Sequence, residues 1–334
     1  MHSALPRGNA AYLMLFLAPL LWGGAFVAAK YVVLELHPLA AASLRFLISF
    51  LVLFLVLLFW EGRAAFPRIR DLPLLAFLGL TGVFAYNALF FYGIGATAAT
   101  DGALVVASSP VLTAALSALF LGERFGGRQL TGFLLSLLGM LTIITKGHPE
   151  VLLTWEIDKG GLLFLGCALS WACYSVAGKK AMTGFTPLAA TTWATGLGAV
   201  FLTVAAVPYY VLPAVTGLSS MAFWSLMFLA VCASGIAFVF WFVGVDRVGA
   251  GRAGVFVNVA PLSAAVWAAL ILGEQLALFH LVGAILIFGG VYLVTRSSRH
   301  PPPGYRARPR GSRAGFPRSR FLSSTSTAVP IKQV

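Results

Sequence analysis

Long apolar runs, broken by short stretches of charged residues and glycine, fill the chain as far as residue 296. A hydrocarbon layer about 30 Å thick takes roughly 20 helical residues to cross, and ten runs have about that length. The runs do not alternate between polar and apolar positions, and open sheet edges find no partners in lipid, so helices are predicted. The ten predicted spans are 11–33, 39–60, 72–94, 102–121, 128–146, 160–180, 187–209, 221–245, 253–272 and 278–296.

The composition agrees with a lipid-facing surface. Hydrophobic residues make up 60% of the 334 positions and charged residues 10%, whereas a soluble domain carries roughly 25% charged residues. The net charge of +13 would suit a nucleic-acid binder, but nine basic residues and no acidic one lie from Arg296 onward, which leaves +4 for the preceding part. The basic character therefore belongs mostly to a tail, and membrane lipids rather than nucleic acid are the expected partners.

The lysines and arginines of the short loops predict the orientation. With the N-terminus in the cytoplasm, 19 basic residues fall inside and 3 outside, or 10 against 3 without the tail. Both termini are therefore predicted to be cytoplasmic, in the inner or plasma membrane. The tail is rich in proline and poor in apolar residues, so it is predicted to be disordered, either near anionic headgroups or solvated without a specific role.

The apolar region consists of two similar halves. Residues 93–139 align without gaps with residues 244–290 at an offset of 151, and earlier in each half the offset is 149. The matched positions include Trp22 with Trp171, Lys30 with Lys179, Pro38 with Pro187, Pro110 with Pro261, and Gly122-Glu123 with Gly273-Glu274. Each half has five spans, an odd number, so the second half enters the membrane from the opposite side. Inverted repeats are typical of secondary transporters, whose substrate site lies where the halves meet.

The predicted fold is an all-α polytopic membrane protein of ten transmembrane helices in two inverted five-helix repeats. The predicted parts are a cytoplasmic N-terminus at 1–10, a first repeat at 11–146, an external linker at 147–159, a second repeat at 160–296 and the tail at 297–334. A structural duplication without transport is the alternative explanation of the repeat.

Several short motifs in this order resemble the EamA family of the drug/metabolite transporter superfamily. They are Leu21-Trp22-Gly23-Gly24 through Lys30, Leu44-Arg45-Phe46, Ser109-Pro110-Val111 to Leu121-Gly122-Glu123-Arg124, Asn258-Val259-Ala260-Pro261 and Leu272-Gly273-Glu274. The resemblance covers roughly residues 11–296 and implies ten helices, cytoplasmic termini, a central cavity and export of small metabolites, often amino acids. Many relatives have tyrosine or threonine where this chain has Asn87, which leaves the substrate open.

Motifs of enzymes and metal sites are weak in this sequence. Residues 249–254 match the dinucleotide pattern GxGxxG, but they lie between two predicted membrane helices, where a loop and close helix packing explain the glycines better. The three cysteines lie in apolar runs and share no metal-type spacing with the five histidines. We expect no catalytic residue, no cofactor and no metal.

Aromatic and amide side chains inside the spans are the first candidates for substrate contact. Trp22 and Trp171 lie deep in spans one and six, away from the interfaces where tryptophan is commonest. They either stack on a substrate or only pack helices together. Tyr86, Asn87, Tyr174 and Trp241 are further candidates, and Asn87 is expected to point inward because lipid disfavours an amide.

Two matched prolines, Pro110 and Pro261, are predicted to bend spans four and nine, since a proline in mid-helix frees a carbonyl group. Ser108, Ser109 and Asn258 lie beside them. These polar side chains either form part of a polar substrate site or satisfy the bent helices.

Charged residues supply the last candidates. Arg45 is predicted inside the membrane, roughly 10 Å along its helix from the outer end, where it either serves function or extends to the interface. Lys30 and Lys179 are predicted at opposite mouths, as attractors for a carboxylate or as interfacial lysines. Glu123 and Glu274 lie at helix–loop turns, where they are expected to be hydrated caps or to form contacts at the junction of the repeats rather than to relay protons.

The hypothesis is a carrier that exports a small molecule by alternating access. The alternatives are an antiporter of the sugar-phosphate or nucleotide-sugar type, a flippase for lipid-linked sugars, or, in another class, a membrane scaffold or enzyme without transport. The oligomeric state is left open.

Overall fold

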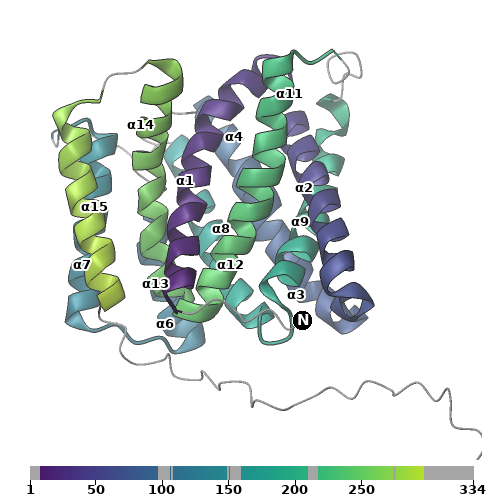
Figure 1. Ribbon diagram of the computed structural model, residues 1–334, viewed down its shortest axis with the longest axis horizontal. Helices are drawn as coiled ribbons and strands as arrows, with labels where there is room; N and C mark the ends of the chain where they lie inside the picture. The colour runs from purple at the N-terminus through teal and green to yellow at the C-terminus, as the bar shows by residue number, and fades with distance from the viewer. Residues whose placement is uncertain are drawn as a thin grey trace, which may run out of the picture. The chain divides into compact units, whose positions relative to one another are not determined.

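The computed structural model describes residues 8–96, 106, 108–148, 150, 159–209, 217–273 and 276–296, and every regular element in these ranges is a helix (Figure 1). The first half contains α1 (Gly8–Val33), α2 (Pro38–Trp60), η1 (Gly62–Ala65), η2 (Ile69–Asp71), α3 (Leu72–Leu78), η3 (Gly79–Ala85), α4 (Tyr86–Ala96), α6 (Ser109–Leu121) and α7 (Gly127–Ile144). The second half contains α8 (Lys159–Ala181), α9 (Pro187–Ala206), η5 (Val207–Tyr209), α11 (Ser220–Met227), η6 (Phe228–Ile236), α12 (Ala237–Val248), α13 (Ala250–Gly254), η7 (Val255–Asn258), α14 (Val259–Leu272) and α15 (Leu278–Arg296).

Eight of the described helical segments are long and apolar enough to cross a membrane, and two further apolar helices, α6 and α7, are shorter. The chain is therefore a multi-pass membrane protein. The predicted count of ten spans stays a prediction, because only the part from Ser109 to Leu121 of the predicted fourth span forms a long described helix. The predicted tail and most of the predicted 147–159 linker lie outside the described residues.

Local sequence explains where several helices begin and end. α2 and α9 both start with a proline, where the missing N–H costs no hydrogen bond. The side chain of His37 accepts a bond from the N–H of Leu39, and that of Thr186 accepts one from Ala189, as N-caps do. Glycines also follow the last residues of the matched helices α6 and α14. Gly122 and Gly273 have φ of 66° and 70°, a left-handed conformation that glycine adopts without strain.

The third span of each half contains a π-helical segment. In the first half it is η3, between α3 and α4, and in the second half it is η6, between α11 and α12. These segments begin 149 residues apart and end 151 residues apart, so they occupy matched positions of the repeat. π-Helical turns are rare and occur frequently at functional sites. The hydrophobic pattern did not predict them.

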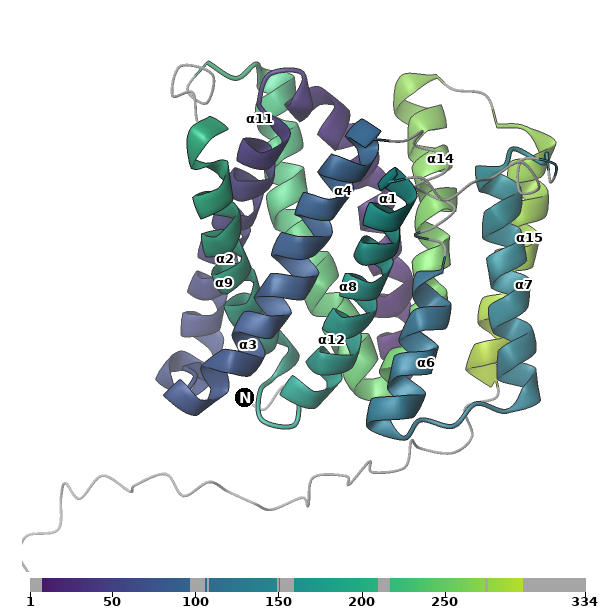
Figure 2. The ribbon, with the colours of Figure 1, turned by 180° about the vertical axis from the view of Figure 1, so that it is seen from behind.

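Helices of each half pack on helices of the other half. α1 packs on α12 and α14 of the second half, and its counterpart α8 packs on α4 and α6 of the first. α2 contacts its own counterpart α9, and α7 contacts α15. This reciprocal pattern is consistent with the predicted layout of two repeats, and it places α1, α8 and α12 at the centre (Figure 2).

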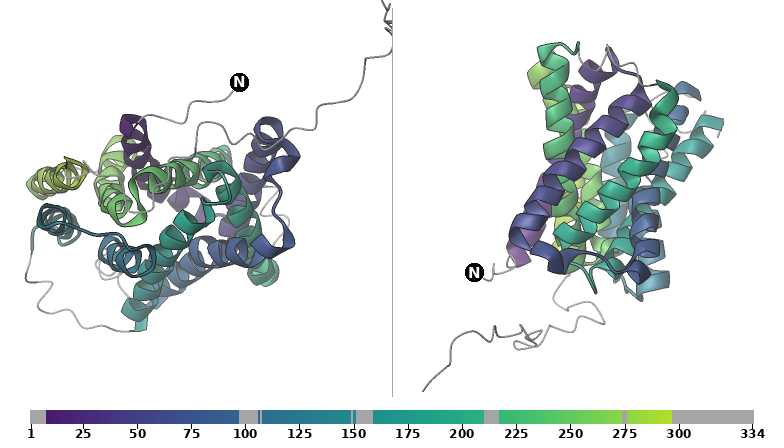
Figure 3. Two further views of the ribbon diagram at one scale, coloured as in Figure 1. Left: turned by 90° about the horizontal axis from the view of Figure 1, so that it is seen from below. Right: turned by 90° about the vertical axis from the view of Figure 1, so that its right-hand side faces the viewer.

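α7 and α15 lie side by side at one edge of the bundle (Figure 1, Figure 2 and Figure 3). Gly132 and Gly139 of α7 face Gly290 and Gly283 of α15. A Cβ atom added at any of the four would lie 2.5–2.8 Å from a carbonyl oxygen of the facing glycine. Only glycine permits this close approach of two helix backbones, the small-residue packing common in membrane proteins.

Candidate functional site

A cluster of aromatic side chains joins the two halves at the centre of the bundle. Trp22 of α1 lies edge-on to Trp171 of α8, with ring centroids 5.1 Å apart and planes at 89°. Trp241 of α12 lies 5.7 Å from Trp22 and 5.3 Å from Trp171. Phe238 and Tyr174 complete the cluster, at 6.0 and 5.6 Å from Trp171. We call these five residues the central aromatic cluster. The structure thus brings together Trp22, Trp171, Tyr174 and Trp241, all predicted from the sequence.

The cluster lies at the point where the two repeats contact each other. Trp22 and Trp171 occupy matched positions, yet they touch, which requires that the repeat axis pass close to both rings. Edge-to-face pairs of aromatic rings are favourable by about 0.5–1.5 kcal/mol beyond area burial. The same flat apolar surfaces are suited to contact an apolar or aromatic part of a small molecule.

Unpaired polar atoms distinguish this cluster from an ordinary apolar core. The indole N–H of Trp22 donates to the carbonyl oxygen of Ala233, at 3.0 Å. Nε1 of Trp171, Nε1 of Trp241 and the hydroxyl of Tyr174 are buried and have no hydrogen-bond partner among the described residues. Buried polar groups in proteins are nearly always paired, so three such atoms in one cluster mark it as a candidate site for a ligand with polar groups.

Arg45 lies beside the cluster and points into the bundle. Its Nε donates to the Ser234 hydroxyl at 2.7 Å, and its Cζ lies 4.7 Å from the ring centroid of Phe46. Phe46 in turn contacts Phe238 of the cluster, at 6.1 Å between centroids. Arg45 forms no ion pair with a carboxylate of the described residues. Its guanidinium is therefore a positive charge inside the protein without a neutralising partner in the described ranges.

Tyr86 and Asn87, at the start of α4, differ in what they contact. The Tyr86 ring lies 6.0 Å from that of Trp171 and is only partly buried, so it extends the cluster toward α4. Asn87 is 8% exposed, as the inward orientation predicted, but its amide donates to the carbonyl of Val83 at 2.6 Å. That bond runs within one helix, across the end of η3. The amide of Asn87 thus pairs with a carbonyl group of its own helix.

Ser109 and Asn258, two of the polar residues predicted beside the proline bends, form hydrogen bonds with residues outside the central aromatic cluster. Ser109 donates to the carbonyl of Val106 at 2.6 Å, and Ser108 is the partly buried residue before α6. Asn258 donates to the Ser136 hydroxyl of α7 at 3.1 Å. Its Oδ1 is buried without a partner in the described part of the chain.

The positions of the two prolines correct the prediction of mid-helix bends. Pro110 lies in the first turn of α6, where a proline removes no intrahelical hydrogen bond. Pro261 is the third residue of α14, the helix that directly follows the 3₁₀ segment η7. The irregular backbone of the ninth span therefore precedes its proline.

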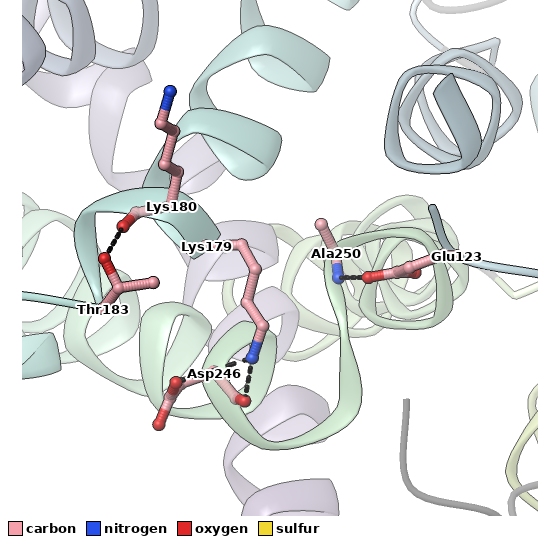
Figure 4. A network of polar contacts seen from close by, with 6 residues as sticks. All are labelled: Glu123, Lys179, Lys180, Thr183, Asp246 and Ala250. Carbon is pink, nitrogen blue, oxygen red and sulfur yellow. Dashed lines mark hydrogen bonds and ion pairs between the residues drawn. The ribbon is translucent and has the colours of Figure 1, made fainter. Parts of the chain in front are cut away.

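The two lysines lie in the last turns of α1 and α8. Lys30, in the last turn of α1, is exposed. Lys179, its counterpart at the end of α8, forms an ion pair with the Asp246 carboxylate at 3.5 Å and donates to the Asp246 carbonyl (Figure 4). Lys179 thus joins α8 to α12 within the second half.

Glu123 connects the two halves at the same end of the bundle. Its carboxylate accepts a hydrogen bond from the N–H of Ala250 at 3.0 Å, at the start of α13 (Figure 4). It accepts a second one from the N–H of Gly251 at 3.2 Å. The side chain is 9% exposed, and this burial raises the pKa of Glu123 although both hydrogen bonds and the charges of Arg252 and Lys179 act in the opposite direction. The predicted junction between repeats agrees with this contact, but the carboxylate is buried rather than hydrated. Glu274 lies outside the described residues.

The same contact explains the glycines of the 249–254 motif. Gly249 has φ of 98°, and a Cβ there would lie 2.6 Å from Oε1 of Glu123. A Cβ at Gly251 would lie 2.4 Å from both Phe125 and Ser117. Gly249 caps α13, and Gly251 and Gly254 lie within it. Gly249 and Gly251 make room for Glu123 and α6, so close packing accounts for them.

Three residues of the site were missed by sequence reasoning: Ala233, Ser234 and Phe238. Ser234 and Phe238 precede Trp241 by seven and three residues, one face of a helix, and this spacing was the available signal. No group of three or more histidine, cysteine or acidic residues able to hold a metal ion occurs in the part of the chain described.

Comparison with known proteins gives a consistent result. The model of the EamA-like transporter family matches residues 9–145 and 158–296. The chain is 30% identical to a probable amino-acid metabolite efflux pump of Escherichia coli, over 83% of this chain and 92% of the relative. It is 32% identical to a probable terminal-alkyne amino-acid exporter of Streptantibioticus cattleyicolor, over 69% of this chain and 75% of the relative. An uncharacterized transporter of Bacillus subtilis is 29% identical over 87% of this chain and 95% of the relative.

A solved crystal structure shares the fold, with a TM-score of 0.73 and 22% identity over 88% of this chain and 99% of that one. The family match covers both halves and nearly all of the described helices. The chain belongs to the EamA-like transporter family.

Proposed function

We propose that this protein exports a small metabolite with a carboxylate and an apolar or aromatic body, such as an amino acid or a related compound, by alternating access. The observation that carries the proposal is the central aromatic cluster, which both repeats build at their interface. Beside it lies Arg45, which has no carboxylate partner among the residues that the structure describes. In transporters with inverted repeats, the substrate binds where the repeats meet.

The aromatic rings suit the apolar part of the substrate. A molecule that separates Trp22 from Trp171 would replace ring–ring contacts with ring–substrate contacts of similar strength. The hydroxyl of Tyr174 and the indole N–H of Trp241, both buried and unpaired among the described residues, would gain a partner from a substrate oxygen. An unmade hydrogen bond is costly in an apolar interior, so this gain favours a substrate with acceptor groups.

Arg45 suits the charged part. A charge within a membrane span is costly and is retained mainly where it has a function. The guanidinium is held by Ser234 through Nε, which leaves its terminal nitrogens as donors for a carboxylate, the group that arginine binds best. The relatives named as amino-acid exporters support the same substrate class.

Transport in proteoliposomes tests the substrate. We expect efflux of one or more amino acids from a panel that also contains sugars, sugar phosphates and cationic drugs. Transport of the carboxylate should exceed transport of its carboxamide analogue by at least about tenfold, and Arg45→Met should abolish this preference because the analogue lacks the charge that Arg45 binds. Arg45→Lys, which keeps the charge, is the matched control. Obligatory exchange of sugar phosphates, or an unchanged preference in Arg45→Met, would overturn the assignment.

The proposed location is the inner or plasma membrane, with both termini in the cytoplasm, as the loop charges indicate. Single cysteines in 149–158, in a variant without the three native cysteines, should react with an impermeant thiol reagent applied outside. Cysteines in 301–320 should react only after the membrane is opened. The reverse pattern would show that the orientation is wrong.

A further inference from the structure

Trp22 and Trp171 are equivalent by the repeat, but their indole N–H groups are not in equivalent environments. The N–H of Trp22 donates to the carbonyl of Ala233 in η6. The N–H of Trp171 is buried without a hydrogen-bond partner in the described part of the chain. Two inverted repeats of similar sequence can each adopt the conformation of the other, so the difference belongs to the conformational state rather than to either tryptophan.

The repeat identifies the carbonyl that would serve Trp171. η6 has nine residues and η3 has seven, and they end at the matched residues Ile236 and Ala85. Ala233 lies three residues before the end of η6, and Gly82 lies three residues before the end of η3. The offset of 151 that aligns the following residues gives the same pair. Gly82 is therefore the counterpart of Ala233.

Gly82 already lies against the helix that carries Trp171. A Cβ added at Gly82 would lie 2.2 Å from Cδ2 of Tyr174, which is one helical turn beyond Trp171 on α8. The backbone of η3 thus packs directly on α8, as the backbone of η6 packs on α1. π-Helical segments insert a residue into the regular hydrogen-bond ladder and change which carbonyls are available. A shift of α8 along η3 is the movement that would bring donor and acceptor together.

We propose, on the basis of the alternating access proposed above, that the two tryptophans exchange hydrogen bonds between the two transport states. In the state described here Trp22 donates to Ala233 and Trp171 is unpaired. In the oppositely facing state Trp171 donates to Gly82 and Trp22 is unpaired. Trp22 and Trp171 are thus positioning residues that set the balance of the two states, in addition to any contact with substrate.

The exchange keeps the two states close in free energy. One buried indole N–H is paired and one is unpaired in each state, so the transition breaks one hydrogen bond and makes one of the same kind. A carrier must populate both states, which limits the free-energy difference between them to a few kcal/mol. A device that stabilised only one state would oppose the transport cycle.

Trp→Phe substitutions at the two positions test this directly and serve as each other's control, since each removes one N–H and keeps an aromatic ring. Spin labels on cysteines at exposed positions of the two halves, Arg124 with Lys180 at one end and Leu34 with Met221 at the other, report the populations of the two states by their distances. The measurement uses the full chain in liposomes, without substrate and without the native cysteines.

Trp22→Phe should decrease the ratio of the described state to the opposite state by about three- to tenfold, the effect of one hydrogen bond at about 1.4 kcal/mol per decade. Trp171→Phe should increase the ratio by a similar factor, and the double variant should return it near the original value. Shifts of the same sign, or no shift, would overturn the exchange. If Trp22→Phe does not fold, Trp171→Phe alone must still increase the ratio.

The outcome is separable from that of the proposed function. The population ratio is measured without substrate, whereas export is measured by efflux from the unsubstituted protein. Efflux of amino acids together with shifts of the same sign would refute the exchange alone. Absence of efflux of any panel compound, with two states present and shifts of opposite sign, would refute the proposed substrate and leave the exchange in place.

Discussion

The two repeats meet in two very different ways, at the α7–α15 pair and at the central aromatic cluster. At the α7–α15 pair, four glycines let the backbones approach so closely that no methyl group fits between them. At the cluster, large rings from α1, α8 and α12 fill the interface, and three polar atoms are left without a partner among the described residues.

The difference indicates which contact is able to change. Backbone packing against backbone has one good arrangement, because a shift of either helix forces atoms into overlap. Aromatic rings with several edge-to-face arrangements of similar energy can repack around a ligand. We infer that α7 and α15 form the constant contact of the bundle, whereas the central aromatic cluster changes during transport.

The largest expected effect comes from adding a methyl group to the constant contact. Gly139→Ala or Gly290→Ala places Cβ 2.6 or 2.5 Å from a carbonyl oxygen of the facing helix, which must move away. We expect a loss of about 2–3 kcal/mol of folding free energy, seen as low yield of monodisperse protein and a lower melting temperature in detergent. Gly127→Ala, at the start of α7 with nothing within 4 Å of the added atom, should leave both unchanged. Equal behaviour of the three variants would refute the tight crossing.

The next effect concerns the tryptophans of the cluster. Trp22→Ala and Trp171→Ala should each weaken substrate binding by about several-fold to tenfold, because a stacked ring contributes about 0.5–1.5 kcal/mol beyond burial. Trp→Leu restores packing but not stacking, so it should recover stability without recovering affinity. Binding is read from substrate-dependent tryptophan fluorescence and transport from efflux, with variants at equal abundance. If Leu equals tryptophan at both positions, the rings only pack helices.

A smaller effect is expected from Glu123 and Glu35, two carboxylates that connect the halves at different ends of the bundle. Their contributions to stability change with pH in opposite directions. Burial raises the pKa of Glu123 above its usual 4.5, so the folded protein holds this proton to higher pH than the unfolded chain. The contribution of Glu123 to stability is therefore full below about pH 4.5 and is lost as the pH rises through the pKa in the folded state. Hydrogen bonds from the hydroxyl and then the N–H of Ser219 lower the pKa of Glu35, whose contribution is present above pH 4.5 and lost on acidification.

Melting temperatures between pH 3 and 8 check these opposite signs. Glu123→Gln should remove a decline of stability with rising pH, and Glu35→Gln should remove an increase. The effect of Glu35 should be the weaker one, because its carboxylate is exposed to solvent and screened. Slopes that change in the same direction in both variants would contradict the assignment of burial as the dominant cause at Glu123.

The smallest effect is expected from the tail. Removal of residues 300–334 should leave folding and efflux within error of the full chain, since none of the predicted spans includes them. Loss of efflux by a truncated protein that reaches the membrane would reveal a contribution of its arginines to function.

Much of the site was predictable because rare residues are informative in an apolar sequence. Trp22 and Trp171 stood out as tryptophans deep in their spans and as a matched pair, and the structure places them in contact. Ser108, Ser109 and Asn258 were equally prominent in the sequence. Ser109, however, donates a hydrogen bond to the carbonyl of Val106, three residues earlier, and Asn258 donates one to Ser136 of α7. Depth in a span can be read from the sequence, whereas the direction of a side chain depends on the rotation of its helix.

The sequence by itself determined the apolar spans, the duplication at offsets of 149 and 151, and the family, because length, hydrophobicity and repeated rare residues are local or self-similar properties of the chain. Tertiary structure alone decided that Arg45 points to Ser234 and that Glu123 pairs with the N–H groups of Ala250 and Gly251. It alone decided that, within the described ranges, Trp22 but not Trp171 has a carbonyl partner. Each of these contacts joins residues more than 120 positions apart. It exists only once helices from both halves pack at a particular rotation and depth, which no local pattern encodes.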